Sequence, residues 1–174
     1  MGKVLKAREV GDPVLTEISE EIDINNINEE VLDIIEDLKA TLKFGTGLGI
    51  AAPQIGVNKR IIVVGSEGKE NRYNDQEEIP ITAMLNPSWK KLSDDTDIQY
   101  EGCLSVPGKI GTVERPYYIK MEALDINGEK QVYEFSDFDA RVMCHEYDHL
   151  DGILYIDKAL NLRNADEEYY EEEE

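Results

Sequence analysis

Hydrophobic residues recur at intervals of three and four between Asn28 and Leu42, which is the pattern of one face of a helix. The apolar positions are Val31, Ile34, Ile35, Leu38 and Leu42, and acidic residues occupy much of the opposite face. A short apolar run at 60–65 follows three glycines and predicts a buried strand. We therefore expect an amphipathic helix on the outside of the fold and a strand in its core.

Short segments rich in β-branched and aromatic residues fill 81–134, separated by turn signals such as Pro107-Gly108 and Asn127-Gly128. This alternation is typical of antiparallel sheet. A second helix is predicted to begin near Ser136, where Ser136 and Asp139 resemble a capping box, and to end at Gly152. The expected fold class is α+β, with antiparallel sheets around this central helix and the first helix packed outside.

Composition sets the size and the charge of the molecule. The chain has 174 residues, 41% of them hydrophobic, which suffices for one domain with a core. Its 38 acidic residues outnumber 18 lysines and arginines, and the resulting charge of -20 disfavours contact with phosphate backbones or anionic lipid. We expect no direct nucleic-acid or membrane binding, one domain at 1–164, and an acidic, disordered tail at 165–174.

The cellular compartment follows from two further observations. No run approaches the roughly 18 uncharged apolar residues of a membrane span, and the first residues lack the apolar stretch of a signal peptide. The two cysteines, Cys103 and Cys144, do not suggest a disulfide framework. We expect a cytoplasmic protein, in which such thiols indicate metal binding or catalysis, with burial in the core as the simpler alternative for each.

The two histidines, His145 and His149, are four residues apart in the string HEYDH on the second predicted helix. Residues at this spacing lie on one face of a helix, about 6 Å apart, so both imidazoles can bind one metal ion. Glu146 follows the first histidine around the helix, where its carboxylate can act on a water at the ion without binding the ion itself. The string predicts a catalytic metal centre with Glu146 as general base.

A catalytic ion of this kind needs a third protein ligand, and its fourth position is left to water. Cys103 is the candidate, because it stands in the string EGCLS after a predicted strand and its thiolate suits a borderline-soft divalent metal. Cys144 offers the same chemistry without the geometry, since adjacent helical residues point about 100° apart. We therefore expect Cys144 to be a small, buried, apolar residue.

Small residues dominate the string GLGIAAPQ at 47–54. Its glycines alone could suggest a nucleotide-binding fingerprint, but no strand precedes them, the third glycine of that motif is missing, and the overall charge is unfavourable. A tight loop can instead turn backbone amides and the side-chain amide of Gln54 towards an active site, where they stabilise a developing oxyanion. Gly47, Leu48 and Gly49 are the loop residues expected beside the substrate.

Together, the strings GLGIAAPQ, EGCLS and HEYDH resemble the signatures GxGxAAxQ, EGCxS and HExDH of the peptide deformylase family, in the same order. The resemblance covers most of 8–157. It implies a cytoplasmic, metal-dependent hydrolase of protein biosynthesis and N-terminal processing, which removes the N-formyl group from the formyl-methionine of nascent chains and formyl-methionyl peptides and releases formate. The ion implied is Fe²⁺, and Zn²⁺, Ni²⁺ or Co²⁺ would also suit one thiolate and two imidazoles.

The resemblance also implies roles for further residues. The amide N–H of Leu104 would join Gln54 in stabilising the oxyanion. We place Asp148 and Arg115 just outside the metal ligands, with ordinary surface pairing as the alternative. An apolar pocket for methionine would draw on residues in or beside the motifs, of which the candidates are Leu48, Leu104 and Val142.

Three departures from the family pattern limit these expectations. Cys144 stands where many members have Gln, so a hydrogen bond at that place is in question, and Thr16 stands where Arg is usual. Bacterial members with a long basic C-terminal helix use it to dock on the ribosome, and the acidic string DEEYYEEEE stands here instead. Any ribosome contact would therefore use another route.

Two other functions fit parts of the pattern. A zinc-dependent endopeptidase also uses HExxH on a helix, although the cysteine ligand and the absence of a further histidine speak against it, and a downstream Glu would have to be the third ligand. A structural metal site in an acidic binding module would need a closed shell of four ligands, the fourth being Cys144 or a carboxylate.

Overall fold

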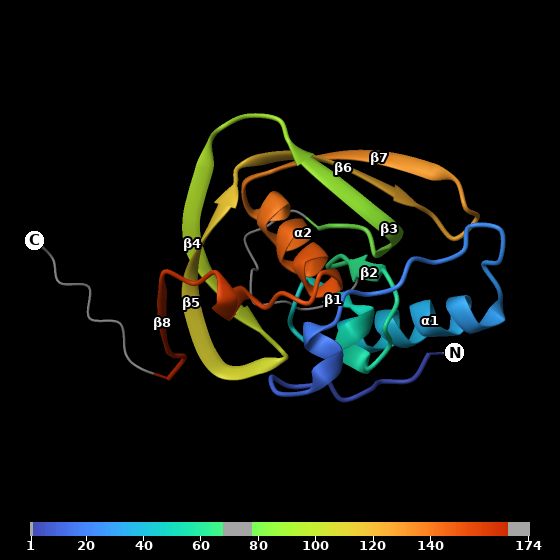
Figure 1. The fold of residues 1–174 in the computed structure, drawn as a ribbon, viewed down its shortest axis with the longest axis horizontal. Coiled ribbons are helices and arrows are strands. Elements are labelled where there is room, and N and C mark those ends of the chain that lie inside the picture. The colour runs from blue at the N-terminus through green and yellow to red at the C-terminus, as the bar shows by residue number, and fades with distance from the viewer. Residues whose placement is uncertain (1, 68–77, 167–174) are drawn as a thin grey trace, which may run out of the picture.

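The computed structural model describes residues 2–67 and 78–166 (Figure 1), so the predicted acidic tail lies outside it from residue 167 onward. In this part of the chain no helix is long and apolar enough to cross a membrane. The helices and strands described are η1 (Pro13–Thr16), α1 (Glu29–Phe44), β1 (Gly49–Ala51), η2 (Ala52–Ile55), β2 (Ile61–Val64), β3 (Thr82–Lys91), β4 (Thr96–Cys103), β5 (Val106–Pro116), β6 (Tyr118–Leu124), β7 (Lys130–Ser136), α2 (Asp137–Leu150), η3 (Tyr155–Asp157) and β8 (Asn161–Asn164), where η marks a 3₁₀ helix.

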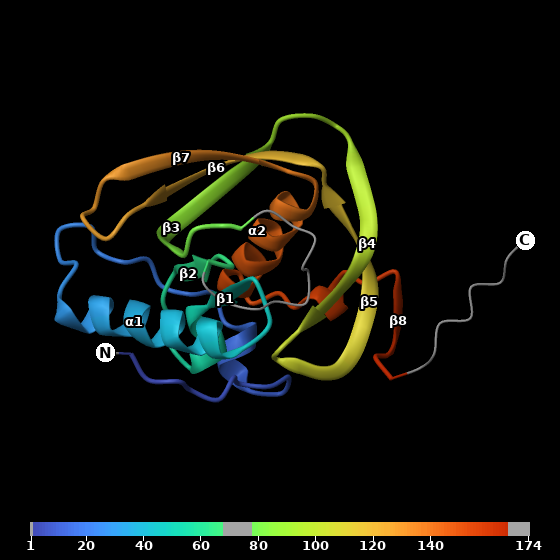
Figure 2. The ribbon, with the colours of Figure 1, turned by 180° about the vertical axis from the view of Figure 1, so that it is seen from behind.

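The strands form two antiparallel sheets with α2 between them. One sheet has five strands in the order β1-β2-β3-β6-β7, and the other has three in the order β4-β5-β8. Both views show α2 in the middle of the molecule, under the five-stranded sheet and beside β4 and β5 (Figures 1 and 2). The predicted α+β fold with a central helix is therefore confirmed.

The first helix, α1, begins and ends close to the predicted residues. The side chain of Asn28 accepts a hydrogen bond from the backbone N–H of Val31, and Gly45 ends the helix. Its apolar face is buried on β2 and the strand-to-helix segment around Ile55, in the first core cluster. Fully burying side chains such as Leu38 and Ile35 stabilises the fold by about 1.5–3 kcal/mol each, which is why an otherwise acidic helix docks here.

The second helix, α2, starts as predicted but without the predicted capping box. The chain passes directly from β7 into α2 through Asp137, whose φ of 53° and N–H bond to the carbonyl of Tyr117 turn the backbone sharply. Ser136 consequently makes no capping hydrogen bond with its side chain, and that part of the prediction is wrong. The helix ends before Gly152, whose φ of 72° closes the last turn as predicted.

Cys144 lies on the side of α2 that faces the core. It is buried with Ala140, Met143 and Leu150 of the same helix and with Met121 of β6. Burial in these apolar surroundings raises the pKa of its thiol to about 12. The expectation of a small, buried, apolar residue is confirmed.

Candidate active site

A cavity opens between α2, the glycine loop before β1 and the end of β4. Helical spacing places five residues of α2 on the cavity wall, because positions three and four apart share a face. These residues are Phe138, Arg141, Val142, His145 and Glu146. The loop contributes Gly47, Leu48 and Gly49, all three predicted to lie beside the substrate.

Three side chains that could hold a metal ion come together beside this cavity, and two of them, Cys103 and His145, line it. His145 and His149 stand one turn apart on α2, with ring centroids 5.2 Å apart, and Cys103 reaches them from the end of β4. The Sγ of Cys103 lies 3.5 Å from the Nε2 of His149, and the donor atoms of all three residues lie within 4.8 Å of one another. One thiolate and two imidazoles in this arrangement fit a divalent transition metal with an open position.

Glu101 orients His145, and sequence reasoning gave it no role. Its Oε1 lies 2.7 Å from the Nδ1 of His145, while Arg115 donates two hydrogen bonds to the carboxylate and Arg141 donates a third at 2.7 Å. A carboxylate held in this way accepts the Nδ1 proton of the imidazole and leaves Nε2 for a metal. Its place two residues before Cys103, on the same face of β4, was the available signal.

The electrostatics favour an ionised Cys103 and an ionised Glu101. Burial opposes ionisation of Cys103, but the neighbouring His149 and His145 outweigh it and lower the pKa of the thiol well below its usual value. Burial likewise opposes ionisation of Glu101, and the hydrogen bonds from Arg115 and His145 lower the pKa of that carboxyl. Both groups therefore carry the charge that a metal ligand and its supporting acceptor require.

Glu146 lines the cavity, and one oxygen of its carboxylate makes no hydrogen bond with the described residues. Its carboxylate is buried, and Oε2 has no hydrogen-bond partner in the described residues. Burial raises the pKa of this carboxyl. A carboxylate in such a place is suited to taking up and returning a proton.

Gln54 is brought next to Cys103 by η2. Its Oε1 accepts a hydrogen bond from the backbone N–H of Ala51, which fixes the orientation of the amide. Its Nε2 then donates to the Sγ of Cys103 at 3.4 Å and to the Oγ of Ser105 at 3.2 Å. The side-chain N–H groups of Gln54 therefore point to the middle and to the last residue of the EGCLS string.

Apolar side chains form the rest of the cavity. Leu48, Leu104 and Val142, the predicted methionine contacts, all line it. Phe138 and Tyr100 line it too, and sequence reasoning missed them because neither belongs to a motif. The cavity thus has an apolar part, formed by these side chains, and a polar part around His145 and Glu146, as a site for a peptide with an apolar side chain should have.

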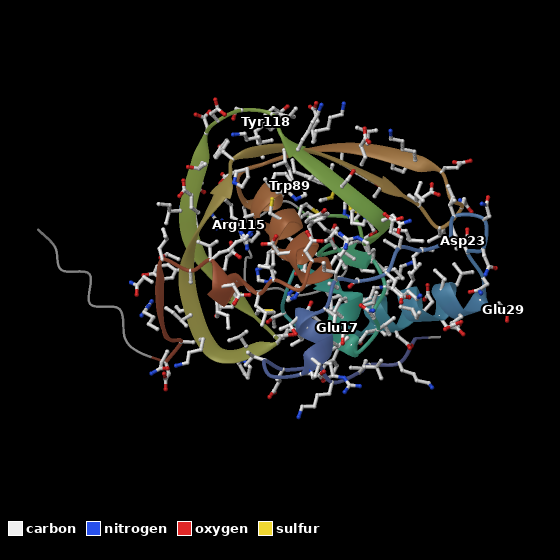
Figure 3. All side chains as sticks on the ribbon, in the orientation of Figure 1. Glu17, Asp23, Glu29, Trp89, Arg115 and Tyr118 are labelled. Atoms are coloured by element: carbon white, nitrogen blue, oxygen red, sulfur yellow. The ribbon has the colours of Figure 1, made fainter. Side chains whose placement is uncertain are left out.

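Asp148 and Arg115 form a buried pair and not a surface pair. The Nη1 of Arg115 donates to Asp148 at 2.6 Å, and the two side chains are 3% and 7% exposed. Figure 3 shows Arg115 between β5 and α2. Its guanidinium donates hydrogen bonds to Asp148 of α2 and to Glu101 of β4. The pair therefore attaches the three-stranded sheet to the helix that carries both histidines.

Comparisons with known proteins agree on one family. The family model described as polypeptide deformylase matches residues 4–165. The peptide deformylase of Finegoldia magna is 38% identical over 157 residues, 90% of each chain, and that of Leptospira biflexa is 40% identical over 156 residues, 89% of this chain and 87% of the relative. None of these relatives supports the alternative of an endopeptidase.

Solved structures give the same result. The class I type b peptide deformylase of Acinetobacter baumannii with Met-Ala-Ser bound is 36% identical with a TM-score of 0.84, over 91% of this chain and 99% of that one. The peptide deformylase of Thermotoga maritima is 30% identical with a TM-score of 0.79, over 90% and 98% of the two chains. Sequence and fold are therefore similar to these enzymes over nearly their full length.

Proposed function

The chain belongs to the polypeptide deformylase family, and from that premise we propose how its own residues carry out the family reaction. It is a metal-dependent hydrolase that removes the N-formyl group from the N-terminal formyl-methionine of newly made polypeptides and releases formate. Its substrates are formyl-methionyl peptides, and removal of the formyl group gives a product with a free N-terminal amine.

We propose Cys103, His145 and His149 as the ligands of one divalent ion, and Fe²⁺ as that ion in the cell. The donor set supports this, because one Sγ and two imidazole nitrogens within 4.8 Å suit Fe²⁺ as well as Zn²⁺, Ni²⁺ and Co²⁺. The hydrogen bond between Glu101 and the Nδ1 of His145 keeps Nε2 available for the ion. When bound, such an ion lowers the pKa of a water molecule and polarises the formyl carbonyl.

Glu146 is the proposed general base and, later, the general acid. Glu146 lines the cavity, and its carboxylate, whose Oε2 has no hydrogen-bond partner in the described residues, would take the proton of the attacking water. The raised pKa of the carboxyl favours holding this proton until the C–N bond of the formamide breaks, when Glu146 returns it to the amine nitrogen. Proton transfer by a positioned side chain contributes about 10²–10⁴-fold to the rate.

Gln54 and the backbone N–H of Leu104 are the proposed donors to the oxygen that becomes negative in the tetrahedral intermediate. The Nε2 of Gln54 already donates to the Sγ of Cys103, so its N–H groups lie beside the proposed ion. Leu104 follows Cys103 directly and lines the cavity. Each such donor contributes about 3 kcal/mol to lowering the barrier.

The apolar walls at Leu48, Leu104 and Val142 are the proposed site for the methionine side chain. The Acinetobacter baumannii relative binds Met-Ala-Ser, a peptide that begins with methionine. A cavity with an apolar wall beside a polar floor would hold the thioether chain and present the formamide to Glu146 at the same time.

Further features of the protein belong to the same proposal. We propose one catalytic domain over 1–164 and action in the cytoplasm. We also propose that the chain binds no nucleic acid and no membrane directly, since the excess of 20 negative charges opposes both.

The observation that carries the proposal is the meeting of Cys103, His145 and His149 beneath the buried carboxylate of Glu146. Formate release from a formyl-Met tripeptide by anaerobically purified protein tests it, with metal content measured on the same sample. We expect release that is lost on chelation and restored by Fe²⁺ or Ni²⁺. One bound metal per chain without formate release would contradict it, and cleavage inside an acetylated peptide would favour an endopeptidase.

A further inference from the structure

The ring of His145 is bounded by a hydrogen bond in its plane and by two neighbouring rings. Its Nδ1 lies 2.7 Å from Glu101, and this bond opposes rotation of the ring about Cβ–Cγ but covers neither face of the ring. The ring of His149 meets it edge to face, with the planes at 72°. The ring of Tyr155 lies nearly parallel to it, with centroids 6.0 Å apart and the planes at 22°. Tyr155 thus presents the face of its aromatic ring to the ring of His145.

Tyr155 is held firmly in place by the core. Its side chain is 1% exposed and belongs to a cluster with Val106, Val113 and Leu154. Cys103 packs against the same cluster, so Tyr155 adjoins two of the three proposed metal ligands. A close-packed core of this kind does not let a side chain move without displacing its neighbours.

The backbone before and through Tyr155 is also fixed. The Oδ2 of Asp157 accepts a hydrogen bond from the N–H of Leu154 and closes η3. Gly152 has a φ of 72° and passes so close to Thr16 that a Cβ built on it would lie 2.6 Å from the Thr16 backbone. The turn after α2 is therefore fixed in one conformation, and it returns the chain to His145, where Tyr155 lies.

From these contacts we propose that Tyr155 is a positioning residue for the metal site. Its ring fixes the plane of His145 and packs behind Cys103, so that both donor atoms face the donor of His149. The proposal rests on the metal ligands proposed above and adds to them a segment, η3, that supplies no ligand. Groups that orient metal ligands commonly change metal affinity 10–100-fold when they are lost.

The hydroxyl of Tyr155 is not the part that positions His145. It is buried and has no hydrogen-bond partner in the described part of the chain. A phenyl ring at this position would keep the parallel contact with His145 and lose only an unsatisfied polar atom. Leucine would fill part of the volume without offering a flat face. Substituting Tyr155 by phenylalanine and by leucine therefore separates the effect of the ring from the effect of the hydroxyl.

Titration of metal-free protein with Co²⁺ tests the proposal, because the d–d and thiolate bands of Co²⁺ report ligand geometry directly. The variants are Tyr155→Phe, Tyr155→Leu and, as a control, Leu38→Ala, which opens a cavity in the separate core cluster under α1. We expect wild-type affinity and bands for Tyr155→Phe and Leu38→Ala. We expect Tyr155→Leu to bind Co²⁺ about 10–100-fold more weakly, with shifted bands.

Kinetics with a formyl-Met tripeptide give a second measurement. In the Tyr155→Leu variant kcat should fall while KM stays near the wild-type value, because the cavity walls are untouched. Wild-type affinity and bands in Tyr155→Leu would overturn the proposal, and so would equal losses in Tyr155→Phe or in Leu38→Ala. Wild-type protein that bound Co²⁺ without a thiolate band would instead overturn the ligand assignment, and the role of Tyr155 with it.

Discussion

Gly49 lies so close to Glu146 that a Cβ atom built on the glycine would stand 2.6 Å from the Cγ of the glutamate. The glycine is therefore required by the neighbouring side chain, since its own backbone lies at the start of a regular strand, β1. Gly49 of the glycine loop is therefore in contact with Glu146, the proposed base. The loop thereby limits where the carboxylate of Glu146 can lie.

Substituting Gly49→Ala should displace Glu146 and lower kcat. A side chain moved by about 1 Å can cost 100-fold in rate, so we expect a loss of roughly 10–100-fold with the metal retained. The control is Gly45→Ala, where an added Cβ would meet nothing nearer than 3.8 Å. Equal kcat values in the two variants would show that the position of Glu146 does not depend on the loop.

Substituting Glu146→Gln should keep the metal and remove most of the turnover. The amide is nearly isosteric but cannot take a proton, so kcat should fall about 10²–10⁴-fold. Metal content and formate release, measured on the same preparation, check this. A variant with wild-type kcat would remove Glu146 from the mechanism.

Substituting Cys103→Ala should lose the ion, because two imidazoles alone bind a divalent metal weakly. Cys144→Ala is the matched control, since Cys144 is the other cysteine of the chain and packs in the core on the same helix as the histidines. Elemental analysis after dialysis should find metal in Cys144→Ala alone. The reverse outcome would make Cys144 the ligand.

The two cysteines should also differ in reactivity once the metal is removed. The neighbouring histidines lower the pKa of the Cys103 thiol well below its usual value and favour the thiolate, whereas the buried thiol of Cys144, with a pKa of about 12, is protonated at pH 8. Iodoacetamide at pH 8 should therefore alkylate Cys103 and spare Cys144 in chelator-treated protein. Peptide mass spectrometry reads the result, and faster labelling of Cys144 would contradict it.

Substituting Asp148→Asn should destabilise the protein strongly. The change leaves Arg115 buried with one carboxylate fewer, at a cost of about 3 kcal/mol. Asp94→Asn removes an exposed partner of Lys91 and should change the free energy of unfolding by less than about 0.5 kcal/mol. Urea denaturation measures both, and similar values for the two variants would show that the buried pair contributes no more than a surface one.

The sequence predicted those parts of the fold and the site that depend on local spacing. Periodicity located α1 because its apolar residues share one face, and the four-residue spacing of the histidines brought their rings together on α2. A turn glycine located the end of α2, because its positive φ ends the helix within the local backbone.

Contacts between distant segments were not predictable from spacing. Glu101 meets His145 across 44 positions of the chain, and its place two residues before Cys103 is the one sequence signal of that contact. The ring of Tyr155 meets His145 because Gly152 and η3 turn the chain back, which depends on packing against Thr16. The capping box failed at Asp137 for a similar reason, since a hydrogen bond to Tyr117 on the neighbouring strand sets that backbone.

The buried pair of Arg115 and Asp148 affects how the proposed site binds its ion. The proposed ligands come from two separate parts of the fold, Cys103 from the three-stranded sheet and the histidines from α2, and Arg115 joins those parts through Glu101 and Asp148. These protein contacts hold the strand that carries Cys103 against the helix that carries the histidines. Such preorganisation means that loading an ion orders little additional structure, so less of its binding free energy is spent on assembling the site.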